Sequence, residues 1–161
     1  MSKLIYNQLA NHKLFNKSIK FGLKRIKLAL DKLGNPERKL NNVISVLGES
    51  GKFTTLYSLK TFIEANNQIV TTHISPSIRD INERFYMGKK KYLSHKKIKE
   101  TIKKIEKLKI PLTVYEVLTL IYILNASEIN ADYNIMETGA LWRLDSNNVI
   151  NFPKIQICTN I

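Results

Sequence analysis

The sequence contains little cysteine and no long hydrophobic run. Cys158 is the single cysteine among 161 residues, which excludes an internal disulfide and favours a reducing compartment. No stretch of about 18 apolar residues is present, which excludes a transmembrane helix, and residues 1–6 lack the apolar segment of a signal peptide. We therefore expect a cytoplasmic protein in which Cys158, within the apolar run 155–158, is a buried core thiol.

Arginine is also scarce, although the chain is strongly basic. The formal net charge is +13, and lysine supplies 21 of the 26 basic residues. Such a charge raises nucleic acids and anionic membranes as partners, but arginine is the residue best suited to bidentate recognition of phosphate. The lysines at 89–91 and over 96–109 have no interleaved aromatic residues that could stack on bases. A basic nucleic-acid-binding domain is therefore the alternative that we rank last, and we expect no membrane partner.

The hydrophobic residues follow an alternating pattern of helices and strands. Leu23, Ile26, Leu30 and Leu33 recur at three- and four-residue steps, which predicts an amphipathic helix within the helically spaced segment 3–33. Short β-branched runs predict strands, and longer periodic segments predict helices. The predicted strands are 43–47, 69–72, 133–136 and 155–161, and the further helices are 52–65, 95–108 and 114–126. This order indicates an α/β fold with helices flanking a mostly parallel sheet.

The strongest local motif lies between the strand at 43–47 and the helix at 52–65. Gly48-Glu49-Ser50-Gly51-Lys52-Phe53-Thr54 is a short relative of the phosphate-binding loop G-x-x-x-x-G-K-[ST]. At such a turn, backbone N–H groups and the positive end of the helix dipole face an anion. We assign nucleotide binding to Gly48, Gly51, Lys52, Phe53 and Thr54, with Lys52 as the catalytic cation and Thr54 as a Mg²⁺ ligand. An ordinary strand-to-helix turn is the alternative.

Further motifs stand in an order and spacing that resemble one enzyme family. The loop corresponds to G-T-N-G-K-G-[ST], Ser75-Pro76 to S-P-H-L, residues 113–119 to T-x-F-E-x-L-T, and residues 137–148 to E-V-G-L-G-G-R-L-D-A-T-N. Shorter matches are found at 21–26, 33–36, 82–84 and 159–161. Over nearly its whole length, the sequence resembles the folylpolyglutamate synthase / dihydrofolate synthase family of the Mur ligase superfamily.

The resemblance implies an ATP- and Mg²⁺-dependent ligase that joins L-glutamate to a folate or dihydropteroate carboxylate through an acyl phosphate. Carried over by position, Ser75, Glu116 and Thr54 would be the metal ligands, since Mg²⁺ prefers oxygen. Glu116 also lies in a markedly apolar helix, where a carboxylate needs a partner or a metal. The residues that would contact the second substrate are Gly22, Leu23, Gly139, Arg143, Asp145 and Asn148.

The sequence departs from the family at several positions. Phe53 replaces a glycine beside the phosphates, Ser77 replaces the histidine of S-P-H-L, and Leu141-Trp142 replaces a Gly-Gly pair. We expect one partial ATP-binding domain over 1–161, with a helical region at 1–40 and an α/β portion at 42–161. It would be an N-terminal fragment whose missing half a second chain could supply, or a degenerate relative that acts as a noncatalytic interaction module. Whether the chain is itself an active enzyme is left open.

Overall fold

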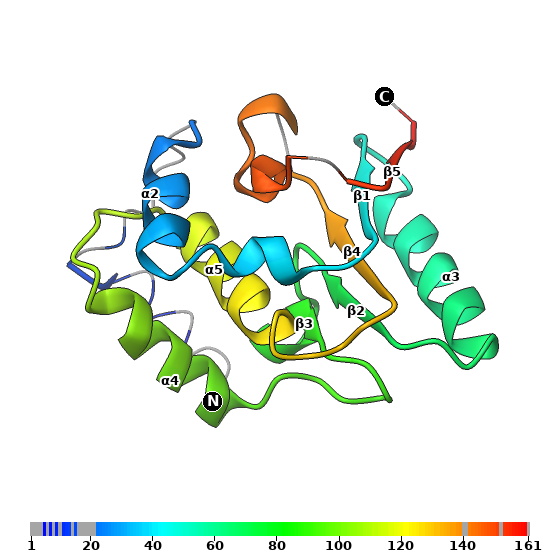
Figure 1. Ribbon diagram of the computed structural model, residues 1–161, viewed down its shortest axis with the longest axis horizontal. Helices are drawn as coiled ribbons and strands as arrows, with labels where there is room; N and C mark the ends of the chain where they lie inside the picture. Colours follow the sequence, from blue (N-terminus) through cyan, green and yellow to red (C-terminus); the bar gives the residue numbers. More distant parts are fainter. Residues whose placement is uncertain are drawn as a thin grey trace.

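The central feature of the fold is a five-stranded sheet with helices on both faces (Figure 1). The structure is a computed structural model, and it describes residues 5, 7, 9, 11–13, 15, 22–139, 142–151 and 153–160. The strands are β1 (Val43–Leu47), β2 (Val70–His73), β3 (Phe85–Tyr86), β4 (Tyr133–Glu137) and β5 (Ile155–Cys158). Their order across the sheet is β3-β2-β4-β1-β5.

The sheet is mostly parallel, as the sequence pattern predicts. Strand β1 pairs in parallel with β4 and β5, and β2 pairs in parallel with β4, whereas β3 runs antiparallel to β2. The antiparallel β3 was not predicted, because two residues are too short to produce a recognisable alternation. Parallel pairing brings the carboxyl ends of β1, β2 and β4 to one edge, which is where ligands bind in open α/β sheets.

The helices form two layers around this sheet. They are α2 (Lys24–Lys32), α3 (Lys52–Ala65), α4 (His95–Glu106) and α5 (Val114–Ala126), with short 3₁₀ turns η1 (Pro36–Lys39), η2 (Ile81–Arg84), η3 (Trp142–Leu144) and η4 (Ser146–Val149). In Figure 1, α3 lies on one side of the strands, and α5, α4 and α2 lie on the other. Helix α5 is buried over most of its length, which explains why its sequence is apolar all round.

The segment 3–33 is not one continuous helix. Helix α2 covers only 24–32, and His12, Phe15 and Gly22 are not helical. Gly22 has φ +118°, a conformation that interrupts a helix and that side-chain-bearing residues resist. The residues of this segment outside the described ranges leave the rest of that prediction untested. Ile5, Leu9 and Phe15 nevertheless join the main hydrophobic core with α2 and α5.

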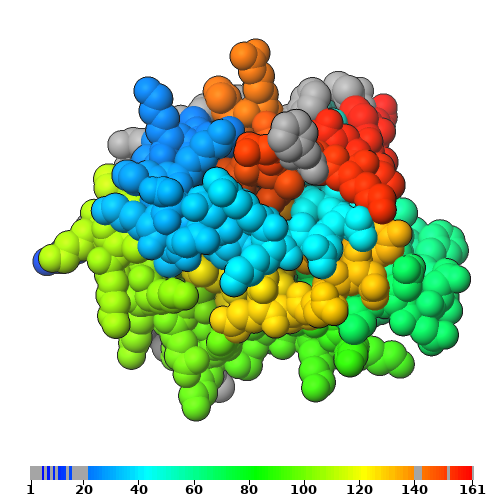
Figure 2. All heavy atoms as spheres, in the orientation of Figure 1, coloured from blue at the N-terminus to red at the C-terminus, as the bar shows by residue number. Residues whose placement is uncertain are grey.

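Strand β5 is exposed, and Cys158 on it is not a core thiol. Ile155 is 44% exposed and Cys158 is also exposed, so the prediction of a buried cysteine is wrong. The error came from the apolar run 155–158, which is typical of a buried strand but here forms the sheet edge beside β1. Figure 2 shows the β5 residues at the molecular surface. Within the described residues, no helix is long and apolar enough to cross a membrane.

Candidate functional site

The phosphate-loop motif forms a tight turn from β1 into α3. Gly48 has φ +127° and Gly51, the N-cap of α3, has φ +83°, so both glycines occupy conformations that other residues disfavour. No side chain of the described residues caps the start of α3. The N–H groups of its first turn, which have no intrahelical acceptor, are therefore available to an anion.

Lys52 folds back over the loop that precedes it. Its Nζ donates to the carbonyl oxygens of Gly48 at 2.6 Å and Glu49 at 3.0 Å. These bonds hold a full positive charge at the start of α3, beside the first-turn N–H groups. Phe53 does not fill the loop: its ring is 42% exposed and stacks on Tyr57 at 5.7 Å. Thr54 is exposed on the same first turn.

The segment after β5 is hydrogen-bonded to the phosphate loop and to the end of β1. The carbonyl oxygen of Asn160 accepts from the N–H of Glu49 at 2.9 Å and of Ser50 at 3.4 Å. Thr159 Oγ1 donates to the carbonyl oxygen of Leu47 at 3.0 Å. Two loop N–H groups are thus already satisfied, so an anion would be held by the first turn of α3 and by Lys52.

Ser75 and Glu137 meet at the carboxyl ends of β2 and β4. The N–H of Ser75, which follows β2, donates to Glu137 Oε2 at 3.0 Å, and Glu137 is the last residue of β4. Arg84 Nη1 donates to Ser75 Oγ at 3.0 Å. Glu137 is only 4% exposed, and burial raises the pKa of its carboxyl while Lys52 and Arg84 oppose that rise. A cation at this place would favour the ionised carboxylate.

Glu116, a predicted metal ligand, is held at the start of α5 by a capping box and an arginine. Its Oε2 accepts from the N–H of Thr113 at 2.7 Å, and Thr113 Oγ1 accepts from the N–H of Glu116, which completes a capping box at the start of α5. Arg25 Nη2 lies 3.1 Å from Glu116 Oε1. The buried carboxylate therefore has a charged partner, so its burial no longer argues for a metal there.

Most of the predicted substrate-side residues gather around the turn after β4. A Cβ on Gly139 would lie 2.6 Å from Asp145 Oδ2 and 3.3 Å from the Tyr115 hydroxyl, so only glycine fits there. Asn148 Nδ2 donates to the carbonyl oxygen of Arg143 at 3.2 Å. The N–H of Gly22 reaches the carbonyl oxygen of Leu144, and Leu23 packs on the core beside it. Phe21, Leu141, Ile161 and the side chain of Trp142 lie outside what the structure describes.

A buried polar network connects this turn to α5 and β4. Asn147 Nδ2 donates to the carbonyl oxygen of Glu137 at 2.6 Å and to the Tyr115 hydroxyl at 3.3 Å. Thr119 Oγ1 donates to Asn147 Oδ1 at 2.9 Å. Asp145 is buried at 7% exposure, and this burial raises the pKa of its carboxyl to about 6, although the N–H groups of Asn147 and Gly139 lower it.

Asp145→Asn should remove a pH dependence of stability. Because the folded-state pKa of Asp145 lies above its ordinary value, folding binds a proton between about pH 4 and pH 6. The stability that this proton contributes is complete below pH 4 and is lost as the pH rises through 6. Relative to the variant, the free energy of unfolding of the wild type should fall by on the order of 2 kcal/mol between pH 4 and pH 7. Urea unfolding in EDTA measures this difference, and a constant difference across that range would contradict the assignment.

Sequence reasoning missed Glu137, Arg84 and Tyr115 as members of this cluster. Burial is the main cause of the raised pKa of the Tyr115 phenol, whereas Ser75 and Arg84 both lower that pKa. Glu137 could have been found from its position, because a carboxylate that ends a buried parallel strand points to the ligand-binding edge of the sheet. Arg84 and Tyr115 carried no such signal, since they come from η2 and α5.

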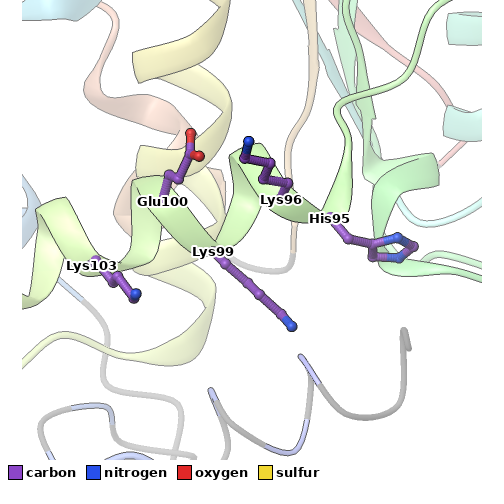
Figure 3. Close-up of a pocket in the computed structure, with 5 residues that line it drawn as sticks. All are labelled: His95, Lys96, Lys99, Glu100 and Lys103. Atoms are coloured by element: carbon purple, nitrogen blue, oxygen red, sulfur yellow. The ribbon is translucent and has the colours of Figure 1, made fainter.

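The lysines of α4 lie far from the cluster that contains Ser75 and Glu137. A hollow of about 400 Å³ runs along the helix and is lined by His95, Lys96, Lys99, Glu100 and Lys103. Figure 3 shows Lys99 and Lys103 projecting from the same side of α4, and Figure 1 places this helix far from the turn between β1 and α3. The His95 ring is paired with Asp80, at 2.6 Å. Among the described residues, no group of three or more His, Cys, Asp and Glu side chains could hold a metal by itself.

The topology of the sheet and the turn between β1 and α3 together define an α/β fold of the phosphate-loop type. No family model matches the chain. Two curated relatives, both called dihydrofolate synthase/folylpolyglutamate synthase, do match it. The one from Bacillus subtilis is 28% identical over 151 residues, and the one from Buchnera aphidicola is 31% identical over 149 residues. These matches cover 89% and 91% of the chain.

Solved structures give the same result. The structure of "E.coli FolC in complex with DHPP and ADP" matches with a TM-score of 0.88 and 27% identity, over 98% of this chain and 37% of that one. A bifunctional folylpolyglutamate synthase/dihydrofolate synthase "with Mn, AMPPNP and L-Glutamate bound" matches with a TM-score of 0.80 and 26% identity, over 92% and 35%. The chain is thus a homologue of the dihydrofolate synthase/folylpolyglutamate synthases, as its motifs predict. It spans about a third of the length of these relatives.

Proposed function

We propose that the chain binds MgATP at the edge of the sheet where β1, β2 and β4 end. The observation that carries this proposal is the convergence of three segments: the turn before α3, Ser75 after β2, and Glu137 at the end of β4. The first turn of α3 and Lys52 would bind the phosphates, with Thr54 exposed beside them. The relatives solved with ADP or AMPPNP support a nucleotide as the ligand.

The residues at this edge fit a magnesium ion. Glu137 offers a buried carboxylate and Ser75 a hydroxyl, and Mg²⁺ is usually held by one or two carboxylates together with waters and substrate phosphates. When bound, the ion would neutralise phosphate charge. Ser75 and Glu137 would hold it, Arg84 would orient the Ser75 hydroxyl, and Lys52 would add a second positive charge. Glu116 is the less favoured ligand, because Arg25 already pairs with it.

The resemblance extends this proposal to a ligase reaction. In such a ligase, the γ-phosphate passes to a folate or dihydropteroate carboxylate, and the amine of L-glutamate then displaces phosphate from the acyl phosphate. The turn 139–148, with Asp145 and Arg143, would contact the pterin-bearing substrate. Because the chain corresponds to about a third of its relatives, this activity is proposed for the complete catalytic unit. A second chain could contribute to that unit.

A nucleotide-binding module without ligase activity is the second candidate. Two observations favour it: the carbonyl oxygen of Asn160 occupies two of the loop N–H groups, and Phe53 stands where the family has glycine. Both candidates require MgATP binding, so the same measurement comes first for each of them.

Calorimetric titration of the 161-residue chain tests the proposal. We expect ATP to bind in the presence of Mg²⁺ and at least about tenfold more weakly in excess EDTA, because Glu137 and the phosphates repel each other without the cation. Magnesium tripolyphosphate should compete with MgATP, since the phosphates are the recognised group. Equal affinity with and without Mg²⁺, or no binding at all, would contradict the proposed site.

A further inference from the structure

We infer that one flank of α3 binds single-stranded nucleic acid by stacking bases on exposed aromatic rings. The exposed rings are those of Phe53, Tyr57 and Tyr92, and together with the buried ring of Tyr86 they are called the aromatic track below. Phe53 and Tyr57 come from α3, Tyr86 from β3, and Tyr92 from the segment bridged to β3. The aromatic track begins beside the MgATP site, because Phe53 stands in the first turn of α3, but Tyr57, Tyr86 and Tyr92 are not part of that site.

The four rings form two contacting pairs. Phe53 stacks on Tyr57 at 5.7 Å between ring centroids, and Tyr92 meets Tyr86 edge-on at 5.3 Å. Lys60 Nζ joins the two pairs, because it lies 4.9 Å from the Tyr57 ring and 4.3 Å from the Tyr86 ring. Phe53, Tyr57 and Tyr92 are each between 42% and 47% exposed, so their rings are accessible to a ligand. Aromatic rings with open faces are the platforms on which unpaired bases stack.

Positive charge borders the aromatic track. The turn between Tyr86 and Tyr92 carries Lys89, Lys90 and Lys91, all exposed. The N–H of Lys90 donates to the Tyr86 hydroxyl at 2.8 Å, which fixes the turn beside the rings. The acidic group at this place, Glu64, is already paired with Lys60 at 3.0 Å. Glu64 also interacts with Lys90, but Lys60 and the three turn lysines outnumber this one carboxylate, so a net positive charge remains that a phosphate backbone would complement.

The fold removes the objection that ranked nucleic acid last from the sequence. Tyr86 and Tyr92 flank the lysines at 89–91 along the chain and are bridged to each other, and Lys60 joins the Tyr57 ring of α3 to the Tyr86 ring. An unpaired strand is favoured over a duplex because base faces are inaccessible inside a duplex. The contacts involve ring faces and backbone charge, so RNA and DNA strands are bound by the same chemistry and with little sequence preference.

Fluorescence anisotropy with labelled twelve-nucleotide oligothymidine and oligouridine tests this inference. Tyr57→Leu and Tyr92→Leu should each weaken binding by about 5-fold to 150-fold, the range for loss of one stacked base. Their salt dependence should stay that of the wild type. Replacing the three lysines at 89–91 with alanine should instead lower the slope of log affinity against log salt by about two. A gain in affinity for uridine over thymidine would assign the site to RNA, and the reverse to DNA.

Phe62→Leu is the matched control. Phe62 is 67% exposed on the same helix, but it lies about 140° around the helix from Tyr57 and outside the aromatic track. Its replacement should leave oligonucleotide binding unchanged. The inference is overturned if Tyr57→Leu and Tyr92→Leu bind like the wild type, if a duplex of equal length binds as tightly, or if the wild type binds no oligonucleotide at low salt.

Discussion

Lys52→Ala is expected to weaken MgATP binding by about 2–4 kcal/mol, or roughly 30- to 1,000-fold. The Lys52 ammonium is held over the loop by the carbonyl oxygens of Gly48 and Glu49, at 2.6 and 3.0 Å. Two loop N–H groups already donate to Asn160, so fewer donors remain for phosphate and the contribution of Lys52 grows. Calorimetry of the variant beside the wild type gives the difference directly.

Lys104→Ala is the control for this substitution. Lys104 is an exposed residue of α4, so its replacement changes the net charge equally but at a distance from the loop. It should leave the affinity unchanged. Urea unfolding of both variants shows whether the fold is retained. If Lys52→Ala is folded and binds MgATP as the wild type does, Lys52 has no role in phosphate binding.

Gly48→Ala is expected to destabilise the fold by about 2–4 kcal/mol and to disturb the phosphate loop. A Cβ on Gly48 would collide with Thr159 Oγ1 and lie 3.0 Å from the carbonyl oxygen of Asn160. The φ of +127° adds backbone strain. Relief of the collision would move the segment after β5 away from the loop and break the bonds from Glu49 and Ser50. Urea unfolding measures the loss of stability.

Gly34→Ala is the control that introduces backbone strain without a steric collision. Gly34 also has a positive φ, +83°, but no atom lies within 4 Å of the Cβ that alanine would add. Its replacement should cost only about 1 kcal/mol. Equal destabilisation by the two substitutions would show that contact between Gly48 and the segment after β5 contributes nothing to stability.

The elements next to the phosphate loop were predictable because local chemistry determines them. The prediction of 43–47 as a strand and 52–65 as a helix is confirmed residue for residue. Four β-branched or leucine residues make the strand, and the Gly48 and Gly51 turn needs positive φ that glycine supplies. Helix 114–126 is also confirmed, with Thr113 and Glu116 forming its capping box.

The composition of the proposed metal site was not predictable in the same way. Glu116 and Glu137 both stand in motifs that resemble the family, and both are nearly fully buried. Their difference is tertiary: Arg25, 91 residues away in sequence, pairs with Glu116, whereas Ser75 and the charge of Lys52 meet Glu137. Periodicity cannot show which distant residue will neutralise a buried carboxylate.

The contacts of the segment after β5 could likewise not be predicted from sequence patterns. The carbonyl oxygen of Asn160 is a backbone group, and any residue could supply it. The aromatic track is partly of the same kind, because Tyr57 and Lys60 are neighbours on α3 but Tyr86 approaches Lys60 only after α3 packs on the sheet. Such sites depend on which elements become neighbours, and local sequence does not specify that.

The most direct test of the central claim is the position of the metal when nucleotide is bound. Mn²⁺ with ATP should broaden the backbone amide NMR signals of Ser75, Glu137 and the first turn of α3 most strongly. Glu137→Gln should abolish this pattern, while Glu116→Gln, which keeps an acceptor for the Thr113 N–H, should retain it. Broadening centred on Thr113 and Glu116, and unchanged in Glu137→Gln, would contradict the account.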